Sequence, residues 1–274
     1  MAKHQGLSNN DLMQAALDGD LEATYQLGCR FLTGSHGVSV NAAQAIKWLQ
    51  KAADEGHSDA QTNLGSCYMH GRGVPPSADK AVKMYRKASA KKNINGMYNL
   101  GVCYRNGLGV KEDCDVAIQW FYKSAVAGHS AAQNNLGVLY EKGSGLTIVQ
   151  DLETAVMWYG RAAKQGHPYG MFNLATCYAH ARGVEQDQVL AYKWLSAASE
   201  HGHQDAQEVL ARIPQYVQED MRQQLASRRS QDVELEELVP ASRNHPSTSP
   251  LFAADEERME GGAWKQGGMR RAIG

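Results

Sequence analysis

The sequence has 274 residues, in which 28 Lys and Arg nearly balance 29 Asp and Glu. A net charge of -1 leaves no excess of cations for phosphate contacts, so we expect no nucleic-acid partner. No window approaches the roughly 20 apolar residues that a membrane-spanning helix requires, so we also expect no membrane partner.

The N-terminal residues MAKHQGLSNNDL contain neither the apolar stretch of a secretory signal nor the Arg-rich pattern of a transit peptide. We therefore expect a soluble, cytoplasmic protein. The stretch NNDLMQAALDGDLEA resembles one helix of a unit that recurs later in the chain. Residues 1–22 are predicted to form a half-repeat that caps the N-terminal end of a stack.

One pattern recurs from Ala23 onward. Its copies read ATYQLGCRFLTGSHGV, AQTNLGSCYMHGRGV, GMYNLGVCYRNGLGV, AQNNLGVLYEKGSGL and GMFNLATCYAHARGV. A shared leucine, followed by one more beyond the fifth copy, marks the register: Leu27, Leu64, Leu100, Leu136, Leu174 and Leu210. Periods of 20–50 residues are typical of repeat architectures, so the chain is predicted to be a stack of similar units.

Each copy predicts two helices joined by a glycine turn. In the second copy Ala60, Leu64 and Tyr68 lie four residues apart on one helix face, and Gly71 stands where a left-handed residue ends a helix. Ser58 is the predicted N-cap of this helix, and Ser130 that of its counterpart two units later. With only seven prolines and apolar residues three or four apart, the fold class is all-α.

Three glycines interrupt the first helices at one repeated position, namely Gly65, Gly101 and Gly137. Glycine inside a helix costs about 0.5–1 kcal/mol relative to alanine, so its recurrence needs a packing reason. We predict a close approach of the paired helices, with each glycine facing Ala81, Ala117 or Ala155.

The leucine, glycine, tyrosine and glycine-turn positions together resemble the Sel-1-like repeat family, a relative of the tetratricopeptide repeat. The resemblance covers residues 23–205 as five repeats and implies a right-handed α-solenoid. Residues 206–229 are predicted to form C-terminal capping helices. Residues 230–274, in which Pro, Ser and Gly accumulate and the repeat register is lost, are predicted to be a disordered tail.

The residue types of an active site occur in this pattern, but their spacing favours structural roles. His57, His129, His167 and His203 recur at one turn, and equivalent residues of neighbouring units should lie too far apart to share a metal ion. Cys67, Cys103 and Cys177 lie beside the apolar stripe, where no base stands at a fixed local spacing. We therefore predict no catalytic residues, no metal and no cofactor.

Asparagine precedes the repeated leucine in four copies, at Asn63, Asn99, Asn135 and Asn173. Asparagine is a poor helix former, so four in register indicate a hydrogen-bonding role. In tetratricopeptide repeats, to which the chain is similar, first helices line a concave groove and asparagines there can hold the backbone of an extended peptide. These four residues are the predicted peptide-binding site; the alternative is a bond to the neighbouring repeat.

The expected function is a protein-protein interaction scaffold or adaptor that holds a partner protein or peptide in the concave groove. The alternative is a hydrolase-type enzyme like the cysteine-rich secreted repeat proteins, although this chain lacks their paired cysteines. The chain is expected to be a monomer and not an enzyme. The repeat predicts the fold and leaves the partner's identity open.

Overall fold

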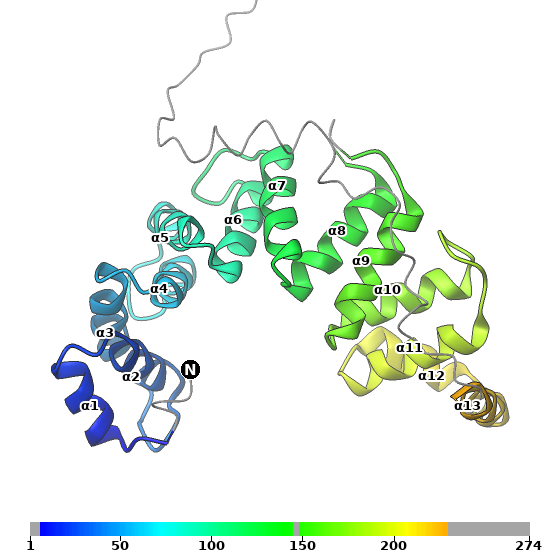
Figure 1. Ribbon diagram of the computed structural model, residues 1–274, viewed down its shortest axis with the longest axis horizontal. Coiled ribbons are helices and arrows are strands. Elements are labelled where there is room, and N and C mark those ends of the chain that lie inside the picture. The colour runs from blue at the N-terminus through cyan, green and yellow to red at the C-terminus, as the bar shows by residue number, and fades with distance from the viewer. Residues whose placement is uncertain (1–5, 145–147, 230–274) are drawn as a thin grey trace, which may run out of the picture. The chain divides into compact units, whose positions relative to one another are not determined.

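The computed structural model describes residues 6–144 and 148–229, and these form α-helices without a β-strand (Figure 1). The helices are α1 (Asn9–Leu17), α2 (Leu21–Thr33), α3 (Ala42–Asp54), α4 (Ser58–His70), α5 (Ala78–Ala90), α6 (Ile94–Asn106), α7 (Cys114–Val126), α8 (Ser130–Lys142), α9 (Leu152–Lys164), α10 (Pro168–Ala179), α11 (Gln188–Glu200), α12 (Gln204–Arg212) and α13 (Gln215–Arg229). The all-α prediction is confirmed, whereas the predicted disordered tail lies outside the described residues.

Five helix pairs follow one another along the chain: α2 with α3, α4 with α5, α6 with α7, α8 with α9, and α10 with α11. The second helix of each pair also packs against the first helix of the next pair. α1 packs on α2, while α11 contacts both α12 and α13, with Pro214 between these last two helices. The chain is thus an α-solenoid of five two-helix repeats with further helices at both ends.

The two helices of each pair form two layers. Figure 1 shows α2 and α4 together on one side of the stack and α3 and α5 together on the other. At two repeat boundaries the first helices contact each other, α4 with α6 and α8 with α10, more closely than the second helices do at any boundary. In a curved stack the layer with the closer spacing is the inner one, so we call the first helices the inner layer and the second helices the outer layer.

The repeated leucine is the centre of the core in every unit. Leu27, Leu64, Leu100, Leu136 and Leu174 are all buried, at 0–1% exposure. Buried alanines, tyrosines and tryptophans surround them in clusters that each draw on consecutive helices. A single repeat could not bury this surface alone, so stability arises from nearest-neighbour packing.

The glycines of the first helices allow the close approach that the sequence predicts, but the facing residue differs from the prediction. A Cβ at Gly101 would lie 2.7 Å from the ring of Phe121, and one at Gly137 would lie 2.5 Å from the ring of Tyr159. At Gly65 the nearest atoms belong to Tyr85, with the carbonyl oxygen of Ala81 third. The partner is therefore an aromatic ring one turn beyond the predicted alanine, because the long aromatic side chain reaches the glycine before the alanine does.

The predicted helix caps at Ser58 and Ser130 were wrong by one residue. His57 and His129 have the extended backbone of N-caps, and their side chains accept from the backbone N–H of Ala60 and Ala132. Imidazole is a less common cap than a serine hydroxyl, which is why the preference-based prediction failed. Gly71 does end α4 in the left-handed conformation, at φ 69°.

Candidate functional site

The four asparagines of the predicted site all lie on inner-layer helices and are half-buried: Asn63 on α4, Asn99 on α6, Asn135 on α8 and Asn173 on α10. Each shares a helix face with the residue three positions further on, namely Ser66, Val102, Val138 and Thr176. The inner layer therefore presents a row of asparagines, one in each of the second to fifth repeats, each beside a small or apolar side chain.

Two of these amides are engaged with the preceding repeat. The Nδ2 of Asn63 donates to the Tyr25 hydroxyl at 3.3 Å and lies 3.4 Å from Cys29 Sγ. The Nδ2 of Asn173 donates to Oδ1 of Asn134 at 2.9 Å. For Asn63 and Asn173, the side chains therefore make the bond to the neighbouring repeat that was the alternative to peptide binding.

The other two amides differ. Neither Asn99 nor Asn135 has a side-chain hydrogen bond to any residue in the described ranges. They occupy α6 and α8, the first helices of the third and fourth repeats. An amide carries two donors and an acceptor with two lone pairs, so these two side chains retain their full capacity for a ligand. The row therefore has two kinds of member. Asn63 and Asn173, at its two ends, bond to the preceding repeat, whereas the side chains of Asn99 and Asn135, in its middle, are available to a ligand.

The histidines of the repeated turn are structural. Nδ1 of His57, His129, His167 and His203 accepts from a backbone N–H of the next helix at 3.2–3.3 Å. Three of the rings also stack on an aromatic ring of the preceding repeat: His57 on Tyr25, His129 on Tyr98 and His203 on Phe172. The predicted role as turn residues that bond and pack between units is confirmed.

One carboxylate does approach a histidine of this turn. Nε2 of His57 lies 3.1 Å from Oε2 of Glu22, which resembles the oriented imidazole of a hydrolase. The Nδ1 of the same ring is the acceptor of the α4 cap, so neither nitrogen remains to take a proton from a nucleophile. Across the described residues no group of three or more His, Cys, Asp and Glu side chains has the arrangement of a metal site.

The three repeated cysteines are core residues. Cys67, Cys103 and Cys177 are buried, and burial raises the pKa of the Cys103 thiol to about 11 and that of Cys177 to about 12. A nucleophilic cysteine requires a lowered pKa and partial exposure, so these thiols match the predicted structural role.

The sequence predictions missed the aromatic partners of the histidines. Tyr25, Tyr98 and Phe172 stand two residues before the repeated leucine, and Thr62 occupies that position in the second repeat. There the turn residue is Asn93 instead of histidine, and the Thr62 hydroxyl donates to Asn93 Oδ1 at 3.0 Å. Reading these two positions together along the repeats could have revealed the pairing.

Comparison with known proteins agrees with this geometry. The Sel1 repeat family model matches residues 21–57, 58–93, 94–129, 130–167 and 168–203, so the chain belongs to the Sel1 repeat family. Proteins of this family are generally non-catalytic scaffolds for protein interactions. A search of curated proteins gave no match.

Solved structures include two similar repeat proteins. A protective antigen of uropathogenic Escherichia coli with an SLR fold is 34% identical at a TM-score of 0.65, over 72% of this chain and 42% of that chain. A Sel1 repeat protein from Oxalobacter formigenes is 29% identical at a TM-score of 0.69, over 75% of this chain and 59% of that chain. The chain thus covers less than two thirds of either relative.

A third structure, the immunity protein Pa5087 from Pseudomonas aeruginosa, is 18% identical at a TM-score of 0.50, over 72% of this chain and 74% of that chain. At this level of identity the likeness concerns the fold alone. In the described part of the chain, no helix has the length and apolarity needed to cross a membrane.

Proposed function

We propose that this protein is a non-catalytic interaction scaffold that holds an extended peptide segment of a partner protein on its inner layer. The proposal rests on a difference in side-chain hydrogen bonding among the four asparagines. The side chains of Asn63 and Asn173 are bonded to the preceding repeat, whereas those of Asn99 and Asn135 have no hydrogen bond in the described part of the chain.

A peptide backbone needs a donor and an acceptor at each residue, whatever its side chains are, and an asparagine amide supplies both. Asn99 and Asn135 belong to consecutive repeats, on α6 and α8, and both helices pack against α7. An extended chain exposes backbone donors and acceptors along its whole length, at about 3.3 Å per residue, so one peptide that runs along the inner layer could contact both amides. The half-buried Val102 and Val138 beside them would receive apolar side chains of the same peptide.

The energetic logic also supports this role. An asparagine in a helix is less favourable than alanine by several tenths of a kcal/mol, and Asn63 and Asn173 offset that cost through bonds within the stack. Asn99 and Asn135 have no such compensation in the described residues, which is the pattern expected of residues kept for a ligand.

The test is affinity capture of partners by the full chain, read by quantitative mass spectrometry. We would compare the wild type with Asn99→Ala/Asn135→Ala and with Gln44→Ala/Gln223→Ala, which removes two exposed amides from outside the inner layer. The proposal is supported if proteins captured by the wild type and by Gln44→Ala/Gln223→Ala are lost from Asn99→Ala/Asn135→Ala. Equal capture by all three proteins contradicts it, provided that their helical circular dichroism signals agree.

A further inference from the structure

The outer-layer helix α5 differs from its counterparts in charge. Between Ala78 and Ala90 it carries Lys80, Lys83, Arg86 and Lys87 against the single acid Asp79, and Lys91 and Lys92 follow directly. The position of Arg86 is uncharged in every other repeat, where it is occupied by Gln50, Tyr122, Gly160 and Ser196. The concentration of cations is therefore specific to the second repeat.

The turn after α5 also carries more positive charge than the equivalent turns of the other repeats. The position of Lys92 is glycine in the other four repeats, at Gly56, Gly128, Gly166 and Gly202, all with positive φ. Lys92 keeps that left-handed conformation at φ 59°, where a side chain with a Cβ is strained. Lys91 likewise stands where the first repeat has Glu55. The chain thus accepts backbone strain at a site where it gains positive charge.

These cations have no acidic partner within 4.0 Å among the residues that the structure describes. Lys80 lies over the ring of Tyr68, Arg86 donates to the Tyr104 hydroxyl at 2.9 Å, and Lys91 donates to the carbonyl of Gly56 at 2.6 Å. Lys83 and Lys87 are exposed and make no polar contact with any described residue. Asp79 lies one turn before Lys83, but no ion pair within 4.0 Å joins α5 to an acid in the described ranges.

The charges are costly to the helix itself. Lys83, Lys87 and Lys91 are spaced four residues apart, and like charges at that spacing destabilise a helix. The helix dipole favours cations in the last turn, which could account for Lys87 and Lys91. It disfavours cations near the N-terminal end, where Lys80 and Lys83 lie, so the dipole does not explain the whole set.

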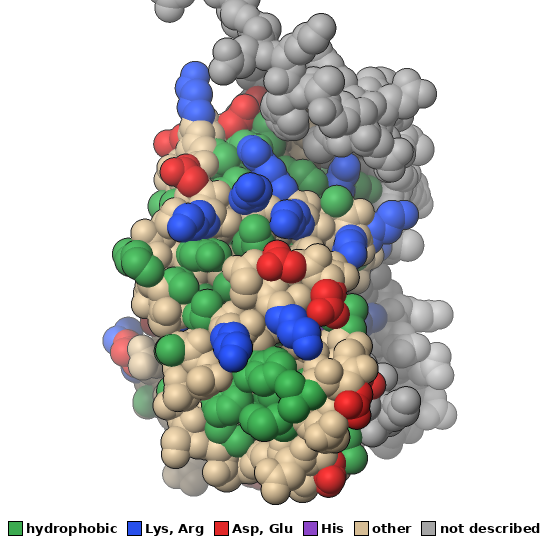
Figure 2. Space-filling model, turned by 90° about the vertical axis from the view of Figure 1, so that its left-hand side faces the viewer, with side chains coloured by type: hydrophobic (Ala, Val, Ile, Leu, Met, Phe, Trp, Pro, Cys, Tyr) green, Lys and Arg blue, Asp and Glu red, His purple; other side chains and the backbone are tan. Residues whose placement is uncertain are grey.

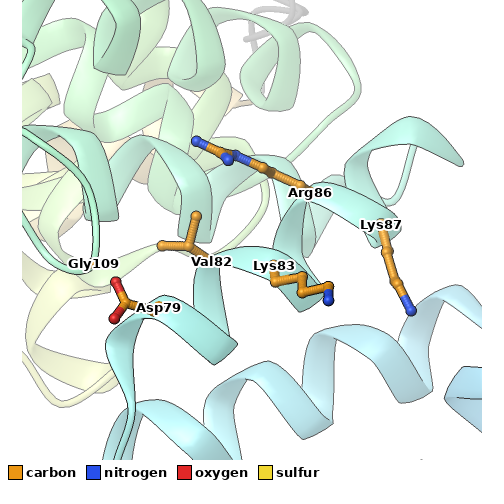
Figure 3. Close-up of a pocket in the computed structure, with 6 residues that line it drawn as sticks. All are labelled: Asp79, Val82, Lys83, Arg86, Lys87 and Gly109. Carbon is orange, nitrogen blue, oxygen red and sulfur yellow. The ribbon is translucent and has the colours of Figure 1, made fainter. Parts of the chain in front are cut away.

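The cations border a shallow depression on the outer layer. It is lined by Asp79, Val82, Lys83, Arg86 and Lys87 of α5 and by Gly109 of the turn between α6 and α7. Figure 3 shows Lys83 and Lys87 extending to one side of α5 and Arg86 to the other. Figure 2 views the side of the molecule that carries α3 and α5 and shows Lys and Arg side chains over its upper part.

We propose that the α5 basic face, defined as Lys80, Lys83, Lys87 and Lys91, binds an acidic peptide segment of a partner protein. Four residues of an α-helix rise about 6 Å, and two residues of an extended chain rise about 6.6 Å. A peptide with an acid at every second position therefore places its carboxylates in register with Lys83, Lys87 and Lys91. The exposed ammonium groups would gain the charged partners that the described residues lack.

A single-stranded nucleic acid is a less suitable ligand for this face. Binding of that class generally combines a basic groove with exposed aromatic side chains on which bases stack. None of the six residues that line the depression is aromatic.

The test measures binding of a fluorescent peptide of alternating Glu and Ser, about twelve residues long, to the full chain by anisotropy. Exposed ion pairs are individually weak, so Lys83→Gln/Lys87→Gln should weaken binding about fivefold, and added salt should weaken it further. The control Lys142→Gln/Arg212→Gln removes two exposed charges elsewhere and should leave the affinity unchanged. A matched peptide of Gln and Ser should not bind.

Three outcomes would overturn the proposal. One is that the wild-type protein does not bind the acidic peptide, or that the control Lys142→Gln/Arg212→Gln weakens binding as much as Lys83→Gln/Lys87→Gln does. Another is that an RNA of about twelve nucleotides binds more tightly than the peptide and loses affinity in Lys83→Gln/Lys87→Gln. The third is that Asn99→Ala/Asn135→Ala weakens the binding, which would place the peptide on the inner layer instead.

Discussion

The imidazole ring of His129 stacks on the phenol ring of Tyr98, with centroids 4.4 Å apart and an interplanar angle of 12°. Tyr98 lies on α6 and His129 caps α8, so this contact joins the third repeat to the fourth. At the boundary between the second and third repeats, Thr62 and Asn93 form a hydrogen bond in the same place. One pair of positions thus carries either a ring stack or a hydrogen bond across each of these boundaries.

This relationship predicts coupling between the two positions. Tyr98→Thr and His129→Asn should each destabilise the protein, but together they recreate the Thr62 and Asn93 pair. The double variant should therefore lose less free energy of unfolding than the sum of the single variants, by about 0.5–1.5 kcal/mol. Urea denaturation of the four proteins measures this coupling. Additive losses would show that the stack contributes no specific energy.

The histidine caps predict a loss of stability in mild acid. Burial lowers the pKa of His129 and of His167 below the ordinary value of 6.5, and each Nδ1 must be unprotonated to accept its cap hydrogen bond. The unfolded chain then binds more protons than the folded chain as the pH falls through 6.5, so stability falls in that window. Thermal melts between pH 7.5 and pH 5 should show a decreasing Tm.

The variant His129→Asn/His167→Asn should flatten this pH dependence, because Asn93 shows that asparagine caps the same turn without titrating. Replacing the exposed His70 by Asn is the matched control and should leave the slope as it is in the wild type. An unchanged slope in the double variant would assign the acid sensitivity to other groups.

The close contact between Gly101 and Phe121 predicts that a larger residue at position 101 destabilises the protein, and that a smaller residue at position 121 restores part of the stability. A Cβ at Gly101 would overlap the ring of Phe121, so Gly101→Ala should cost about 1–3 kcal/mol of unfolding free energy. The fifth repeat has alanine at this position, Ala175, and leucine, Leu195, in place of the ring. Gly101→Ala/Phe121→Leu recreates that pair and should recover part of the loss. A double variant less stable than Gly101→Ala would contradict this packing account.

The strained turn predicts that stability and binding move in opposite directions. Lys92→Gly relieves a left-handed lysine and should raise the free energy of unfolding by about 1 kcal/mol. The same change removes a cation beside the α5 basic face and should weaken binding of the acidic peptide. Denaturation and anisotropy on one preparation test both effects. A variant that is less stable than the wild type would show that Lys92 makes a contact the turn requires.

Much of the fold follows from periodicity in the sequence. Leu64 and Leu100 are buried where the repeat places them, and Gly71 ends its helix as turn chemistry requires. The cap residues were missed because residue preferences favour Ser58, while the ring stack of His57 on Tyr25 is a contact between repeats that no local rule contains. Pairings of this kind arise only when the stack forms.

The sequence predicts the row of four asparagines, but it does not predict which of their side chains bond to the preceding repeat. The four asparagines are equivalent by register, and the difference between Asn63 and Asn99 comes from the neighbour across the repeat boundary. Tyr25 and Cys29 lie within reach of Asn63, whereas no described residue bonds to the amide of Asn99. The net charge of -1 does not predict the α5 basic face, because it conceals a local excess of cations.

The proposed role of Asn99 and Asn135 is to hold a peptide backbone. A peptide selected for binding to the full chain should be titrated against the wild type and Asn99→Ala/Asn135→Ala by calorimetry. Each lost hydrogen bond is worth about 0.5–1.5 kcal/mol, so the account predicts a dissociation constant about tenfold higher for the variant, with an equal or higher Tm. An unchanged dissociation constant for a peptide that binds the inner layer would contradict it.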